Sequence, residues 1–166
     1  FVGVTDGKIS YLSKHAPEEK PAQIIDATGM VLMPGLINCH THLPMQLLRG
    51  YADDLKLQEW LNDYIFPRED RLDSRCVRAA TTLAVAECLK FGVTSVSDMY
   101  YFCDDICDVI AKSGMKANIS RGTSMFLGDD FDFEKFPACQ ELVALKNKWH
   151  NFDGGRIKIE ASIHAE

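Results

Sequence analysis

The sequence predicts an α/β protein, and three observations carry that prediction. From residue 34 onward, short apolar or β-branched segments alternate with helical segments four times, which is typical of parallel strands joined by crossover helices. The first 33 residues carry turn signals instead, without a helical pattern. Finally, 46% apolar and 25% charged residues suit a soluble domain with a real core.

Residues 1–33 predict a small β unit. The dipeptide Asp6-Gly7 separates two short strand-like segments, and Asp-Gly is a strong hairpin signal. Residues 13–23 are polar and broken by prolines, so we expect a loop there. Residues 24–33 have the pattern of a second strand pair with a turn in the middle.

The remaining elements follow from periodicity and from capping residues. We expect strands at residues 36–43, 93–100, 115–122 and 155–165. We expect helices at residues 56–70, 74–92, 104–114 and 133–149, the second capped by Ser74 and closed by Gly92.

The length of the chain leaves two architectures open. A closed eight-stranded barrel typically takes about 250 residues, and this chain has 166. Four strand–helix units form either a small open sheet or the first half of a barrel. Because the chain starts with Phe1 and stops inside a strand pattern, we expect it to be part of a longer protein.

Charge and composition exclude several partners. The net charge of −6 and a pI near 5.3 argue against nucleic acid and anionic membranes. No apolar run approaches the length of a membrane span, and "FVGVTDGKIS" lacks a signal-peptide pattern. The cysteines include no CxxC pair, which is typical of a reducing compartment. We therefore expect a cytoplasmic protein.

The stretch "PGLINCHTHL", residues 34–43, contains the most informative pair of side chains, His40 and His42. In a strand, residues two apart point to the same face, so both imidazoles reach one ion. Imidazole suits zinc, iron or nickel. The alternative is a chance pair of core histidines, each needing a hydrogen-bond partner. Two ligands are also fewer than the three that a catalytic zinc usually takes.

The longer string "VLMPGLINCHTHLPMQLLRGYADDL", residues 31–55, closely resembles the opening of the amidohydrolase superfamily. It is most similar to the branch of 5-methylthioadenosine/S-adenosylhomocysteine deaminases and triazine chlorohydrolases, and the resemblance extends over essentially the whole chain. It implies that residues 34–166 are the first βα units of a metal-dependent (β/α)8 TIM-type barrel. Residues 1–33 would then be part of a small N-terminal β-sandwich.

The resemblance also implies a reaction and a cofactor. Family members similar to this chain deaminate purine nucleosides: a metal-bound hydroxide attacks the ring carbon, and ammonia leaves. His40 and His42 match the first two metal ligands, with zinc the expected divalent ion and iron or nickel left open. The family's further ligands and its proton-shuttling Glu lie on later strands. We therefore expect no catalytic residue within this chain, and no activity from it alone.

Three further residues match substrate-binding positions of the family. Glu69, in "PRED", falls where the deaminases place a glutamate that binds ribose hydroxyls. Arg121, in "ISRG", matches an arginine suited to a substrate carboxylate. His164 aligns with a substrate-contacting histidine, although Ser162 and Ile163 replace the usual Gly-Pro before it. A second family arginine has no counterpart, which weakens the case for a substrate with a carboxylate tail.

Two alternatives stay open at this stage. The whole protein could act on another substrate of the branch, as a guanine or cytosine deaminase or a triazine chlorohydrolase does. The chain could instead be a non-catalytic fragment or assembly piece. Because a half-barrel exposes sheet edges and an apolar face, such a chain would associate through the incomplete barrel or form a homo-oligomer.

Overall fold

The computed structural model describes residues 1–124 and 130–165. The chain divides into two compact units, Phe1–Pro34 and Gly35–Glu166. The first unit contains the expected hairpin, in which β1 (Val2–Thr5) pairs antiparallel with β2 (Lys8–Leu12). Its turn residues have positive φ angles of 51° at Asp6 and 72° at Gly7, the conformation that an Asp-Gly hairpin turn requires.

The prediction of a second strand pair in residues 24–33 is wrong. The expected turn is present, because the Met30 N–H donates to the Ala27 carbonyl at 3.0 Å. The segments on either side are not strands, and among the described residues they pair neither with each other nor with another strand. Their apolar side chains are exposed: Ile24, Ile25, Met30, Val31, Leu32 and Met33.

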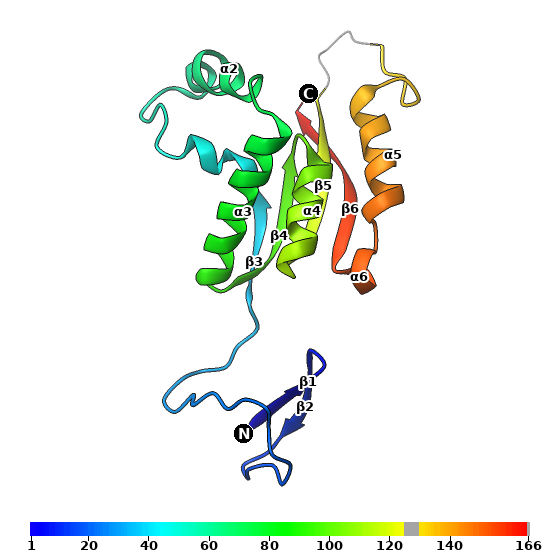
Figure 1. Ribbon diagram of the computed structural model, residues 1–166. Helices are drawn as coiled ribbons and strands as arrows, with labels where there is room; N and C mark the ends of the chain where they lie inside the picture. Colours follow the sequence, from blue (N-terminus) through cyan, green and yellow to red (C-terminus); the bar gives the residue numbers. More distant parts are fainter. Residues whose placement is uncertain (125–129, 166) are drawn as a thin grey trace. The chain divides into compact units, whose positions relative to one another are not determined.

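The second unit contains the predicted parallel sheet (Figure 1). Its strands lie in the order β3-β4-β5-β6, and every neighbouring pair is parallel. The bounds are Leu36–Thr41 for β3, Val93–Tyr100 for β4, Lys116–Ser124 for β5 and Ile157–Ala165 for β6. All four strands were predicted from the sequence, and their order follows the chain.

Each connection between strands of the parallel sheet contains one or more helices. They are the 3-10 helix η1 (Leu43–Leu48), α1 (Leu57–Glu59), the π-helix η2 (Trp60–Ile65), α2 (Phe66–Glu69), α3 (Ser74–Lys90), α4 (Cys103–Ser113), α5 (Pro137–Trp149) and α6 (Phe152–Gly155). In Figure 1, α3, α4 and α5 follow one another along one side of the sheet. Within residues 1–124 and 130–165, no helix is both long and apolar enough to span a membrane.

The N-cap of α3 and the start of α5 differ from the prediction, each for a local reason. The N-cap of α3 is Asp73, not Ser74, because the Asp73 side chain accepts the Cys76 N–H at 2.7 Å. Helix α5 begins at Pro137, later than predicted, since proline has no N–H and fits the first helical turn.

The core lies between the sheet and the helices α3, α4 and α5. Alternate residues of β4 are buried, including Val96 and Tyr100, and they pack against buried helix residues. Other members of this cluster are Val77, Val85, Ile106, Ile110, Met115, Ile119, Leu145, Trp149, Ile157 and Ile159. Burial of this apolar surface fixes the strand ends, on which the site described below depends.

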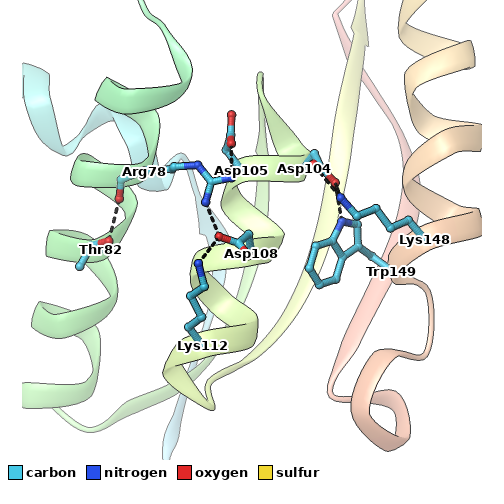
Figure 2. A network of polar contacts seen from close by, with 8 residues as sticks. All are labelled: Arg78, Thr82, Asp104, Asp105, Asp108, Lys112, Lys148 and Trp149. Atoms are coloured by element: carbon cyan, nitrogen blue, oxygen red, sulfur yellow. Dashed lines mark hydrogen bonds and ion pairs between the residues drawn. The ribbon is translucent and has the colours of Figure 1, made fainter.

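Polar contacts link neighbouring helices (Figure 2). Arg78 of α3 bridges to two acids of α4: its Nη2 lies 2.7 Å from Asp105 Oδ1, and its Nη1 contacts Asp108. On the other flank of α4, Asp104 accepts the indole N–H of Trp149 in α5 at 2.6 Å. The exposed ion pairs contribute little each, whereas Trp149 is buried and anchors α5.

Arg156, which precedes β6, closes the C-terminal end of α4. Its guanidinium donates to the carbonyls of Met115 at 2.8 Å, Ala111 at 3.1 Å and Ile110 at 3.3 Å, and helix ends leave such carbonyls without helical partners. We expect Arg156→Met to lower the free energy of unfolding by about 2 kcal/mol in urea denaturation. Arg156→Lys should keep only part of the stability that Arg156→Met loses, because an ammonium group lacks the planar set of N–H donors of a guanidinium. A loss below about 0.5 kcal/mol for Arg156→Met would contradict this role.

Candidate metal and substrate site

The two histidines of the HxH motif lie where β3 ends. His40 is the second-last residue of β3, and His42 lies between the end of the strand and η1, of which it is the N-cap. Their ring centroids are 5.0 Å apart and the ring planes are nearly perpendicular. The fold therefore brings the two imidazoles together at the C-terminal end of a parallel strand, where α/β folds collect their ligands.

His42 is held in one tautomer by the neighbouring strand. Its Nδ1 lies 2.6 Å from the carbonyl oxygen of Met99 in β4. A carbonyl only accepts, so Nδ1 must carry the hydrogen and donate it. In the neutral ring, Nε2 then keeps its lone pair for a ligand. This is the orientation that metal-binding histidines usually receive from a backbone partner.

Asp98 supports the segment around His42 from inside the core. The carboxylate is 1% exposed, and its Oδ1 accepts the Leu43 N–H at 2.6 Å and lies 2.8 Å from the Thr41 hydroxyl. Burial raises the pKa of Asp98 to about 6, opposed by these contacts and by His42. Oδ2 has no partner among the described residues. A nearby cation would stabilise such a carboxylate.

Glu69 lies at the end of α2, in the connection that follows the histidine pair. The helix before α2, η2, is a π-helix, in which the Phe66 N–H donates to the Leu61 carbonyl five residues back. The next residue, Pro67, has no N–H to donate. The Tyr100 hydroxyl donates to Glu69 Oε1 at 2.6 Å. Burial is the main cause that raises the pKa of Tyr100, and the hydrogen bond to Glu69 is the second. The hydroxyl therefore keeps its proton.

Arg121 is already engaged by protein groups. Its Nε donates to Glu141 Oε2 at 2.5 Å, and its Nη1 donates to the Gly122 carbonyl at 2.6 Å. The guanidinium carbon lies 4.8 Å from the ring centroid of Tyr101, a cation–π distance. A substrate carboxylate at this position would have to share the guanidinium with Glu141.

His164, near the end of β6, faces the histidine pair. Its ring centroid lies 6.0 Å from that of His42. Between strands β4 and β5, Gly122 lies close to Met99: a Cβ there would be 3.0 Å from the Met99 sulfur. Beside the pair is a hollow of about 170 Å³ lined by Cys39, His40, Thr41, Ser97, Met99, Ser120, Glu160, Ser162 and Ile163.

The donor set fits part of a metal site. Two imidazoles lie close together, one with its tautomer fixed for binding through Nε2, and imidazole nitrogen is a usual zinc ligand. Within residues 1–124 and 130–165, no group of three or more His, Cys, Asp or Glu side chains is placed to hold an ion. The described residues thus supply two ligands, and a catalytic site needs more.

Three residues of the site were missed at the level of sequence. Tyr100 joins His42, at 6.0 Å between ring centroids, to Glu69, while Tyr101 stacks against both Tyr100 and Arg121. Asp98 was the only one with a local signal. It alternates with Val96 and Tyr100 along a strand whose alternate residues are buried, and a carboxylate at a core position is rarely without function.

The fold is that of an α/β protein with a parallel sheet and a pair of histidines at the C-terminal end of one strand. The sequence profile described as "Amidohydrolase family" matches residues 31–166. The chain belongs to the amidohydrolase family. It is 38% identical over 165 residues to the 5′-deoxyadenosine deaminase of Methanosphaera stadtmanae, covering 98% of this chain and 37% of that protein.

Other relatives agree with this assignment. The 5-methylthioadenosine/S-adenosylhomocysteine deaminase of Dictyoglomus thermophilum is 37% identical over 157 residues, covering 95% of this chain and 36% of that protein. The chain therefore spans little more than a third of the length of these curated relatives.

The fold also matches solved structures, among them two deaminases. A zinc-bound adenosine deaminase from Xanthomonas campestris is 35% identical with a TM-score of 0.67, covering 78% of this chain and 29% of that one. A guanine deaminase from C. acetobutylicum matches 98% of this chain and 40% of its own, with a TM-score of 0.73. At 20% identity, the second match concerns the fold alone.

Proposed function

We propose that this chain is the N-terminal part of a metal-dependent hydrolytic deaminase of aminated purine nucleosides. The observation that carries the proposal is the His40–His42 pair, with one tautomer fixed for metal binding, close to the Tyr100–Glu69 hydrogen bond. Relatives named 5′-deoxyadenosine deaminase and 5-methylthioadenosine/S-adenosylhomocysteine deaminase, at 38% and 37% identity, support the substrate class.

The proposal includes an architecture for the whole protein. Residues 34–166 would form the first βα units of a (β/α)8 barrel, and residues 1–33 would contribute to a small β-sandwich. The short length of the chain relative to its relatives supports this division. So does the match of 98% of the chain to only 40% of an amidohydrolase structure.

His40 and His42 would hold the metal together with ligands outside this chain. Zinc is the proposed ion, supported by the zinc-bound adenosine deaminase of similar sequence. When bound, a divalent metal lowers the pKa of a coordinated water toward neutrality and so supplies a nucleophile at physiological pH. The Met99 carbonyl and the Asp98 carboxylate would keep the histidine segment in place for that ion.

Substrate binding would fall to the residues around the pair. We assign the ribose hydroxyls to Glu69, because a carboxylate accepts two O–H donors. We assign the base to His164, because its ring centroid lies 6.0 Å from that of His42. Arg121 is paired with Glu141, which favours a nucleoside without a carboxylate tail over an amino-acid conjugate.

The test is ammonia release by the metal-loaded, full-length protein. The panel contains adenosine, 5′-deoxyadenosine, 5-methylthioadenosine, S-adenosylhomocysteine, guanine, cytosine and a chlorinated triazine. We expect at least one nucleoside to be deaminated with a kcat/KM about 100-fold above that for either free base, because binding groups for ribose are left unpaired by a base.

Other outcomes would replace the proposal. Faster turnover of guanine, cytosine or the triazine would make the protein another type of amidohydrolase. No turnover of any compound by metal-loaded protein would favour a non-catalytic role for the chain.

A further inference from the structure

We propose that Tyr100 is a positioning residue for Glu69 and sets the enzyme's preference for substrates with a ribose diol. The proposal rests on the proposed function. The hydroxyl of Tyr100 donates to Glu69 Oε1 at 2.6 Å across an interval of 31 residues. This is the hydrogen bond that ties the end of α2 to the end of β4.

The environment of Tyr100 holds its side chain in place, so that its hydroxyl can orient the Glu69 carboxylate. Tyr100 is 6% exposed and belongs to the main core cluster. Its ring lies 5.2 Å from that of Tyr101 and 6.0 Å from that of His42, measured between centroids. By contrast, Glu69 is only half-buried and ends a four-residue helix. A short helix end does not hold a flexible side chain by itself, so the buried tyrosine restricts the carboxylate.

The hydrogen-bonding capacity of Glu69 explains why this contact favours a diol. An ionised carboxylate has about four acceptor positions on its two oxygens. Tyr100 occupies one position on Oε1, which leaves capacity on both oxygens for two neighbouring hydroxyl donors. Because Tyr100 also contacts the ring of His42, the distance from the diol site to the histidine pair is fixed through one rigid side chain.

The experiment uses the metal-loaded, full-length protein with adenosine and 2′,3′-dideoxyadenosine as substrates. Tyr100→Phe removes the hydroxyl and keeps the ring. We expect kcat/KM for adenosine to fall about tenfold, mainly through KM, because binding rather than chemistry is lost. For the dideoxy analogue, kcat/KM of Tyr100→Phe should differ from that of wild type by less than about twofold. Metal content should stay that of wild type, since the His42–Met99 contact is untouched.

Two further variants sharpen the result. Glu69→Gln should lower kcat/KM for adenosine at least as much, and adding Tyr100→Phe to it should cost little more, because residues acting through one contact are not additive. Tyr11→Phe is the matched control. It removes a tyrosine hydroxyl that donates to the His15 carbonyl in the N-terminal hairpin region, and should leave both substrates unaffected.

The outcomes separate the two proposals. If Tyr100→Phe lowers kcat/KM equally for both substrates, or leaves the adenosine value unchanged, the positioning role is overturned while the proposed function stands. If wild-type protein neither deaminates nor binds any nucleoside of the panel, the proposed function is overturned, and the role of Tyr100 with it.

Discussion

Replacing both His40 and His42 by alanine is expected to abolish stoichiometric metal binding and to lower deamination by about 10³-fold or more. The reason is geometric. The two rings are 5.0 Å apart at the end of one strand, and a site that loses two of its imidazoles has too few ligands to keep a divalent ion. Metal content per chain and ammonia release from a nucleoside are the two measurements.

The single variants and a control refine this prediction. His42→Ala should be at least as damaging as His40→Ala, because only His42 has its tautomer fixed by a backbone carbonyl among the described contacts. His15→Ala is the control, since His15 lies in the other unit and its hydrogen bonds to Tyr11 and Ser13 use its own backbone carbonyl and N–H, which alanine keeps. Unchanged metal content in the double variant would contradict the assignment of the ligands.

Asp98→Ala is expected to weaken metal binding about 10- to 100-fold, although Asp98 itself is not proposed as a ligand. Its Oδ1 accepts the Leu43 N–H and contacts the Thr41 hydroxyl, so it holds the residues on both sides of His42. The variant leaves a buried N–H without a partner, and we expect a loss of about 2 kcal/mol in the free energy of unfolding.

Asp98→Asn separates the hydrogen bonds from the charge. The amide keeps an acceptor oxygen for Leu43, so most of the stability should return. Metal titration with a competing chelator and urea denaturation measure the two effects. Equal metal affinity in Asp98→Ala and wild type would show that the histidine segment does not depend on Asp98.

Most of the second unit could be predicted from the sequence because its local signals agree. Residues 93–100 form a short segment that contains several β-branched residues, and the structure places β4 at those residues. Gly114 follows α4 with a φ of 78°, as a helix-closing glycine does. Residues 24–33 have an equally good strand pattern, yet they form no strand in the described structure. A local pattern does not show whether a surface is present on which a strand pair can bury its apolar side chains, and here those side chains are exposed.

The site was predictable only in part, for a related reason. His40 and His42 are two residues apart, so strand periodicity alone brings them together. The contact between Glu69 and Tyr100 spans 31 residues and two elements, and no local spacing encodes it. Asp98 lies 55 residues from Leu43, and only its position among buried residues of a strand could have drawn attention to it.

X-ray absorption at the metal edge of the full-length protein tests the central claim most directly, with the His40→Ala/His42→Ala variant beside it. We predict a bound divalent ion with imidazole nitrogens at about 2.0–2.1 Å. The imidazole scattering should be lost or sharply reduced in the variant. An ion that keeps the same ligands in the variant, or wild-type protein that binds none, would contradict the claim that this histidine pair is part of a metal centre.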